Sequence, residues 1–177
     1  VSIDAPLVYG SLSLQGARID DIVLTEYRET QAENSDNIHF LKKTGSKDAF
    51  FAEFGWASSD ANQPMPTGQT IWTANRDQLS PGSPVTLSWD NGKGLVFTRV
   101  ISIDENFMFN VEQSATNTTD AAARLASSCA SSAVTFPFAS VPALAFPSPP
   151  VVESAPPNSA LSKSPFLEMR FWSSSSS

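Results

Sequence analysis

The residues whose types could support acid–base catalysis are few and scattered. His39 is the single histidine, and it stands between Ile38 and Phe40 in a segment with strand character. Acid–base chemistry on a sugar needs a positioned base and acid, usually a histidine with a carboxylate. We interpret His39 as a surface or strand-end residue, and we predict no catalytic residue in this chain.

Paired carboxylates and nucleophiles give no stronger candidate. Asp20-Asp21 would point to opposite faces of a strand, and Asp104-Glu105 falls in a predicted turn, so neither pair forms a glycosidase dyad. A serine nucleophile on a sharp G-x-S-x-G turn is not present. The sequence therefore predicts that the protein is not an enzyme.

Metal and cofactor sites are not predicted either. Cys129 is the single cysteine and has no ligand-like neighbours, so neither an internal disulfide nor a metal site is expected. Gly92-Lys93-Gly94 is too short to cradle a phosphate and has no helix after it, which favours a hairpin turn. We expect no cofactor.

The clearest structural pattern predicts a three-stranded antiparallel meander between residues 85 and 118. Asp90-Asn91-Gly92 supplies residues that tolerate positive φ at a tight turn, and Asp104-Glu105-Asn106 forms a second, polar turn. The flanking segments alternate with a period of two and contain many β-branched residues. The predicted strands are Val85–Trp89, Leu95–Ile103 and Phe107–Ser114.

Further strands are predicted nearer the N-terminus. A hairpin through Gln15-Gly16 carries a bulge at Asp20-Asp21, where the alternation is imperfect. The loop Ser58–Gly68 is expected to be exposed. About eight short strands, without a convincing amphipathic helix, indicate an all-β antiparallel sandwich. The predicted strands here are Pro6–Leu14, Arg18–Thr25, Ile38–Leu41, Phe50–Trp56 and Thr70–Ala74.

Several segments resemble the large periplasmic domain of the YidC membrane protein insertases. That family has a W-D-N-G-x-G-L-x-F-x-R segment, then I/V-D-x-x-F/Y-M-F, then a polar strand that ends near an asparagine. Segments at Gly10–Thr30, Phe50–Trp56 and Thr70–Ala74 also resemble the family in the right order, so the resemblance covers roughly residues 1–126. The residues in register are Trp89, Asp90, Asn91, Gly92, Gly94, Leu95, Phe97, Arg99, Asp104, Phe107, Met108, Phe109 and Asn117.

This resemblance implies an antiparallel β-supersandwich of the galactose-mutarotase type, of which the chain would hold the first part. It also implies a place at the periplasmic face of the inner membrane of a Gram-negative bacterium, in a full-length protein integral to that membrane. The family moves new proteins into the membrane through a groove among later transmembrane helices. An accessory role is therefore implied here, with SecD–SecF of the Sec translocon and nascent membrane proteins as partners.

The charge and hydropathy of the chain exclude other partners. The formal net charge is −7, and residues 1–120 hold 8 Lys and Arg against 16 Asp and Glu. Nucleic acids and anionic membrane surfaces both require clustered cations, so neither is an expected partner. No membrane span is predicted, because the nearest candidate, Ala133–Val152, carries five prolines. The chain is expected to be a fragment of a longer protein.

Arg99 has the most unusual placement, because it falls on the apolar side of its strand. A partly buried arginine needs a carboxylate or carbonyl partner, and we predict Asp90 or Glu112. The large aromatic side chains stand at strand spacing and are interpreted as core, the alternative being a sugar- or peptide-binding cleft. These residues are Trp56, Trp72, Trp89, Phe97, Phe107 and Phe109.

The composition changes near residue 120. Residues 121–177 contain 15 serines, 11 alanines and 8 prolines, and no glycine follows Gly94. We expect residues 1–120 to form the first part of the periplasmic domain, and residues 121–177 to be a tail without strands. The tail is either disordered or an out-of-frame translation, since misread GC-rich DNA yields Ala, Ser, Pro and Arg.

Two other classes of protein stay open at this point. One is a sugar-binding or aldose-epimerase-like supersandwich protein, and the other is a secreted, adhesin-like β module. Within the insertase interpretation, an exposed sheet edge could capture an extended peptide by strand addition.

Overall fold

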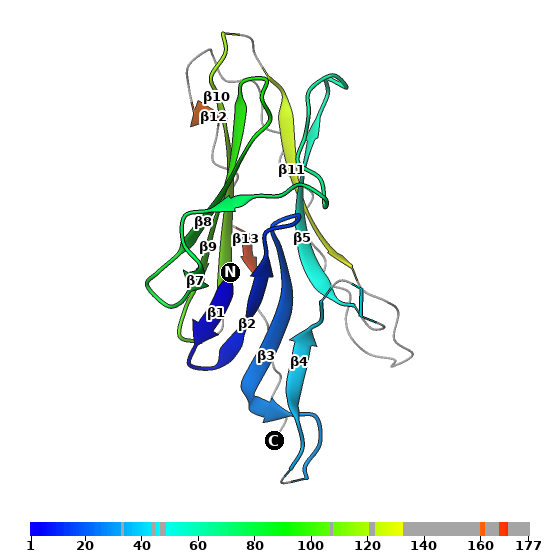
Figure 1. Cartoon of the computed structure of the whole chain (residues 1–177), viewed down its shortest axis with the longest axis vertical. Coiled ribbons are helices and arrows are strands. Elements are labelled where there is room, and N and C mark those ends of the chain that lie inside the picture. Colours follow the sequence, from blue (N-terminus) through cyan, green and yellow to red (C-terminus); the bar gives the residue numbers. More distant parts are fainter. Residues whose placement is uncertain are drawn as a thin grey trace.

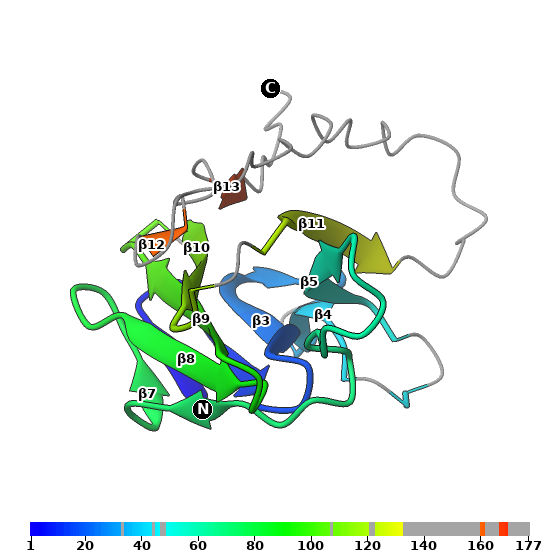
Figure 2. The ribbon, with the colours of Figure 1, turned by 90° about the horizontal axis from the view of Figure 1, so that it is seen from above.

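The computed structural model describes residues 1–132, with gaps at 33, 44, 47–48, 107 and 121–122, together with short strands at 160–161 and 167–169. Every regular element in these residues is a β-strand, and nearly all neighbouring strands are antiparallel. The strands form two sheets that face each other (Figure 2). The predicted all-β antiparallel architecture is therefore confirmed. Most of the predicted tail and the side chain of Cys129 lie outside the described residues.

The first sheet is built mainly from the N-terminal half of the chain (Figure 1). Its strand order is β11-β5-β3-β2-β1-β7, and β4 also pairs with β3. The pairing of β1 with β7 is parallel. The strands are β1 (Ser2–Ala5), β2 (Val8–Ser13), β3 (Arg18–Arg28), β4 (Asn37–Leu41), β5 (Phe51–Ser58), β7 (Gln78–Leu79) and β11 (Leu125–Ser132).

The second sheet is built around the predicted meander, with the order β12-β10-β9-β8-β6 and with β13 also paired to β10. The meander is confirmed by continuous antiparallel registers between β8 and β9 and between β9 and β10. The strands are β6 (Thr73–Ala74), β8 (Val85–Asp90), β9 (Leu95–Ile103), β10 (Phe109–Asn117), β12 (Ala160–Leu161) and β13 (Leu167–Met169).

The core fills the space between the two sheets. In β9 and β10 every second residue is buried, as the period-two pattern predicts. Their inward apolar side chains belong to one cluster with residues of β2, β3 and β5, and each fully buried large apolar side chain contributes about 1.5–3 kcal/mol. The aromatic residues Trp72, Phe97 and Phe109 are buried in this cluster, and Trp56 and Trp89 pack against it. The interpretation of these aromatics as core is confirmed, and Phe107 lies outside the described residues.

The predicted bulge in β3 is also confirmed. Ser11 of β2 pairs with Asp21, and the next residue, Leu12, pairs with Ile19, so Asp20 is the extra residue. A bulge shifts the alternation by one position, which keeps Ile19 and Ile22 both on the buried side.

Strand β11 differs from the expectation that strands stop near residue 120. Its eight residues pair along the full length of β5, from Leu125 opposite Ser58 to Ser132 opposite Phe51. The Ser- and Ala-rich sequence hides this strand because backbone pairing to a neighbour, not side-chain alternation, specifies it. Leu125 nevertheless contributes to the core, where it is 7% exposed. The short strands β1 and β7, and the strands β12 and β13 within the predicted tail, were likewise not predicted.

Candidate functional site

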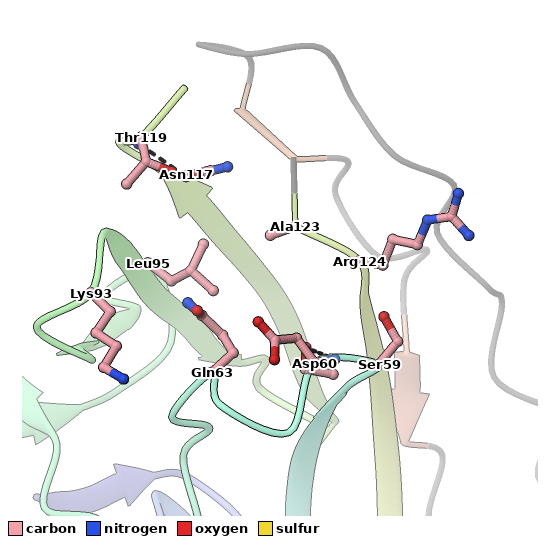
Figure 3. Close-up of a pocket in the computed structure, with 10 residues that line it drawn as sticks. Ser59, Asp60, Gln63, Lys93, Leu95, Asn117, Thr119, Ala123 and Arg124 are labelled. Carbon is pink, nitrogen blue, oxygen red and sulfur yellow. Dashed lines mark hydrogen bonds between the residues drawn. The ribbon is translucent and has the colours of Figure 1, made fainter. Parts of the chain in front are cut away.

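A pocket of about 470 Å³ opens where the two sheets meet at one end of the sandwich (Figure 3). Its volume lies in the range of small-molecule and peptide sites. The end of β5 and the following loop form one wall, and the ends of β9, β10 and β11 form the other. The lining residues are Ser58, Ser59, Asp60, Gln63, Lys93, Leu95, Asn117, Thr119, Ala123 and Arg124.

The turn between β8 and β9 fixes one side of this pocket. Asp90 Oδ1 accepts a hydrogen bond from Gly92 N (2.8 Å), and Asn91 Oδ1 accepts from Lys93 N (2.8 Å) and Leu95 N (3.0 Å). These bonds satisfy the backbone amides of a turn in which Gly92 and Gly94 both have positive φ. The interpretation of Gly92-Lys93-Gly94 as a hairpin turn is therefore confirmed.

The same turn holds the loop after β5. Asn91 Nδ2 donates to Pro64 O (3.2 Å), and Lys93 Nζ donates to Asn62 O (3.2 Å). The tip of the loop at residues 59–62 is exposed, as predicted, but Pro66 is buried. The turn thus decides where Asp60 and Gln63 lie in the pocket wall.

The end of β10 closes the opposite wall. Thr118 donates to Gly94 O from both its backbone N (2.8 Å) and its Oγ1 (3.1 Å). Thr119 donates to Asn117 Oδ1 from its backbone N (3.0 Å) and its Oγ1 (2.8 Å). Asn117 is thereby held at the point where β10 leaves the sheet.

The pocket is lined by hydroxyl, amide and charged side chains together with Leu95 and Ala123. Figure 3 shows the Asp60 carboxylate beside Gln63 inside the pocket, whereas the side chains of Lys93 and Arg124 extend away from its centre. Amide and hydroxyl groups can donate and accept hydrogen bonds but transfer no proton near neutral pH. These groups therefore support binding, and the Asp60 carboxylate adds a negatively charged acceptor to the pocket.

The other candidates from the sequence lie elsewhere. His39 is exposed on β4 and does not line the pocket. Asp104 Oδ1 accepts from Asn106 N and Met108 N (both 2.8 Å) and so stabilises the β9–β10 turn. Within the residues that the structure describes, no group of three or more His, Cys, Asp or Glu is placed to hold a metal ion.

The Asp20-Asp21 pair is divided by the bulge of β3. Asp21 Oδ2 lies 3.2 Å from Lys43 Nζ at the surface. Asp20 is 8% exposed, and burial raises its pKa above the ordinary value of 3.8, while the positive charge of Arg18 acts in the opposite direction. The two carboxylates have separate environments that are set by the fold.

Arg99 forms a second polar centre, deep between the sheets. Its guanidinium donates to Ala17 O (2.7 Å), Phe54 O (2.9 Å) and Gln113 Oε1 (2.9 Å), with a longer contact to Gly16 O (3.4 Å). Its Cζ also lies 5.0 Å from the ring centroid of Phe54 and 4.9 Å from that of Trp72. Arg99, which is 1% exposed, therefore links β9 to β5, β10 and the turn before β3.

The predicted carboxylate partners of Arg99 are wrong, while the expectation of a carbonyl partner is confirmed. Residue Gln113 stands directly opposite Arg99 in the β9–β10 register, so its side chain shares the inner face. Glu112 is the adjacent residue and points to the other face, and the Asp90 carboxylate is engaged in the β8–β9 turn. The strand register would have identified Gln113.

The Arg99 contacts also support an unusual backbone conformation. Ala17 has a φ of 49°, in the left-handed region that costs a residue with a side chain about 1–2 kcal/mol. Its carbonyl receives the shortest Arg99 hydrogen bond. The arginine thus stabilises the tight turn between β2 and β3.

The two sheets, the pocket and the Arg99 centre together define a β-sandwich domain. The residues that resemble the family, such as Asn91 and Arg99, bind other parts of the same chain. The chain belongs to the YidC periplasmic domain family, whose model matches residues 1–133. The family resemblance noted in the sequence is thereby confirmed.

Several bacterial proteins named membrane protein insertase YidC are similar to this chain. The protein of Methylorubrum extorquens is 48% identical over 118 residues, which cover 67% of this chain and 19% of that protein. Those of Roseobacter denitrificans and Caulobacter sp. strain K31 are 48% and 45% identical, over 68% and 71% of this chain and 20% of each relative. The chain spans about a fifth of the length of these relatives.

Proposed function

We propose that this domain is the periplasmic part of a membrane protein insertase and assists the insertion and folding of inner-membrane proteins. The observation that carries the proposal is the family match over residues 1–133, together with relatives of 45–48% identity that are named as insertases. The role is accessory, at the periplasmic face of the inner membrane. No helix of the described residues is long and apolar enough to cross a membrane.

The partners under this proposal are SecD–SecF of the Sec translocon and nascent membrane proteins. Two features of the described residues suit protein ligands. The pocket presents amide and hydroxyl groups that match a peptide backbone, and several strands lie at sheet edges, where extended chains can add. The acidic net charge also disfavours nucleic acid as a competing partner.

The two facing sheets are expected to be the first part of a β-supersandwich of the galactose-mutarotase type. Under this proposal residues 1–120 carry most of the domain. Strand β11 (Leu125–Ser132) completes its first sheet, and the Ser-, Ala- and Pro-rich sequence after residue 133 is a separate segment that is translated out of frame.

The alternative of a sugar-binding or aldose-epimerase-like protein gains no support. The single histidine lies on β4 and not in the pocket, so the histidine–carboxylate pair that acid–base chemistry on a sugar usually needs is not assembled there. The family match points to the insertases instead.

Copurification of SecD–SecF tests the proposed role. In the full-length insertase of Methylorubrum extorquens, the matching segment is replaced by residues 1–133 of this chain, and the protein is isolated from detergent-solubilised membranes. We expect the chimera to retain SecD–SecF as the native insertase does, and a version without the domain to lose most of it. Equal recovery with and without the domain, at equal membrane levels, would contradict the accessory role.

A further inference from the structure

The turn between β8 and β9 contains an asparagine followed by a glycine, Asn91-Gly92, and no other asparagine of the chain precedes a glycine. In such a dipeptide the glycine backbone nitrogen can attack the side-chain amide carbon of the asparagine, because glycine has no Cβ to hinder the approach. Asn91 is half-buried, and Gly92 is exposed with a φ of 68°. Water therefore has access to the place where this reaction would occur.

The reaction is a deamidation, and water is its only co-reactant. Gly92 N forms a bond to Asn91 Cγ and gives up its proton, while the Asn91 Nδ2 group takes up a proton and leaves as ammonia. The product is a cyclic succinimide, and water then opens one of the two C–N bonds of the ring. One opening yields aspartate, and the other yields isoaspartate, in which the main chain runs through Cγ. No atom is oxidised or reduced.

The folded turn engages each group that takes part in this reaction. Gly92 N donates to Asp90 Oδ1 (2.8 Å), and Asn91 Nδ2 donates to Pro64 O (3.2 Å). Asn91 Oδ1 accepts from two later backbone amides of the turn, at 2.8 Å and 3.0 Å. To close the ring, the Asn91 side chain has to rotate toward Gly92 N, and this rotation breaks its bonds to the turn and to the loop at residues 58–68. The reaction in the folded chain therefore requires local opening of the turn.

We infer that Asn91 is a site of spontaneous deamidation, that opening of the β8–β9 turn sets its rate, and that the reaction releases the loop at residues 58–68. An ionised carboxylate has acceptors only, so aspartate at this position cannot donate to Pro64 O. Isoaspartate lengthens the main chain within the turn, so the bonds of Asn91 Oδ1 are lost as well. Asp60 and Gln63 of the released loop line the pocket, so the modification alters the pocket wall. The inference does not depend on the proposed insertase role.

The rates of deamidation in the folded and the unfolded chain test the first part of the inference. The 177-residue chain is incubated at mildly alkaline pH with and without urea, and the peptide that contains Asn91 is followed by mass spectrometry. We expect the folded chain to react at least about tenfold more slowly, because several hydrogen bonds have to break first. Equal rates, or a faster reaction in the folded chain, would overturn the inference.

Gly92→Ala tests the chemistry in urea, where its effect on folding does not matter. The added methyl group hinders the attack on Asn91 Cγ, so we expect this unfolded variant to react at least about tenfold more slowly than the unfolded native sequence. If the two unfolded chains react equally fast, ring closure by Gly92 N is not the route, and the inference is overturned.

Two aspartates at the two turns of the meander test whether the β8–β9 turn itself sets the rate. Asp90→Ala removes the acceptor of Gly92 N, so the folded variant should deamidate Asn91 about threefold faster. Asp104→Ala is the matched control, because Asp104 Oδ1 accepts backbone amides of the β9–β10 turn in the same way. Its rate should equal that of the native chain. No acceleration in Asp90→Ala, or equal acceleration in both variants, would overturn the inference.

Limited proteolysis tests the release of the loop. The deamidated chain carries an additional negative charge and is separated from the unmodified chain by ion exchange. We expect cleavage within residues 58–68 to be about threefold faster in the deamidated chain, because the bond to Pro64 O is lost. Equal cleavage of the two forms would overturn this part of the inference.

Discussion

The Arg99 centre and the pocket each contain residues of one sequence signature, Arg99 in the first and Leu95 and Asn117 in the second, yet the polar atoms of the two sites face different surroundings. The Arg99 guanidinium faces carbonyl oxygens of the opposite sheet in a closed interior. In the pocket, Asp60 and Gln63 face open space (Figure 3). A buried charge has to be satisfied by the protein itself, whereas groups at an open pocket stay available to a ligand. Most of the signature therefore specifies the fold, and only the pocket end can contribute to recognition.

Replacement of Arg99 should have the largest effect. Arg99→Met leaves three carbonyl groups and Gln113 without their donor, and we expect the free energy of unfolding to fall by about 3–5 kcal/mol. Urea unfolding followed by tryptophan fluorescence measures this loss. Arg99→Lys keeps the charge but not the planar fork, so an intermediate loss is expected. An Arg99→Met variant with native-like stability would show that the Arg99 contacts do not hold the sheets together.

Replacement of Gly94 should have the second largest effect, because it lies at the junction of turn and pocket. Its φ is 87°, and an added Cβ would collide with Cγ2 of Thr119. We expect Gly94→Ala to lower the free energy of unfolding by about 2–3 kcal/mol. Gly92→Ala is the matched control, because its φ of 68° is similar but no atom lies within 4 Å of an added Cβ. For Gly92→Ala we expect the free energy of unfolding to fall by only about 1 kcal/mol. Equal losses in the two variants would show that the collision with Thr119 does not cause the larger effect.

Replacement of Asn91 should act locally, at the pocket. Asn91→Ala removes the acceptor of the β8–β9 turn and the donor to Pro64 O, a loss of about 1–2 kcal/mol. We expect faster proteolysis within Ser58–Gly68 at temperatures where the rest of the chain stays folded. Asn91→Asp keeps the turn acceptor and loses only the donor, so it should release the loop at a smaller cost in stability. If the loop stays protected from proteolysis in both variants, Asn91 does not hold it in place.

The smallest expected effect concerns the bulge of β3. Burial raises the folded-state pKa of Asp20 above 3.8, so the folded state binds a proton more readily than the unfolded state. Protonated Asp20 therefore favours folding, and this contribution is lost as the pH rises from about 3.8 through the raised pKa. Asp20→Asn should flatten this part of the pH–stability curve, measured by thermal melts at constant ionic strength. An unchanged slope of stability against pH in Asp20→Asn would show that groups other than Asp20 cause this pH dependence.

The sequence predicted the parts of the fold that side-chain alternation specifies. Strands β8, β9 and β10, their turns and the bulge in β3 all have strong period-two or turn signals. Strands β1, β7 and β11 were missed because they are short or rich in serine and alanine, and they are specified by the neighbours to which they pair.

The candidate site was harder to predict, because it depends on contacts between distant segments. The turn signal at Asp90-Asn91-Gly92 was clear, but nothing in it indicates that Asn91 binds the loop 27 residues earlier. The partner of Arg99, by contrast, could have been predicted, since the predicted meander already places Gln113 on the same face of the sheet as Arg99. Counting the register across the second turn would have favoured Gln113 over Glu112.

The claim that this domain is part of a longer membrane insertase is tested most directly by sequencing the encoding DNA. The reads should extend well upstream of Val1 and well past Ser177, in all three forward frames. We expect a transmembrane segment before Val1, and further strands followed by five hydrophobic spans that resume in another frame after about residue 133, where the family match ends. A single confirmed frame that ends at the serine run, with no membrane span on either side, would contradict the proposed insertase role.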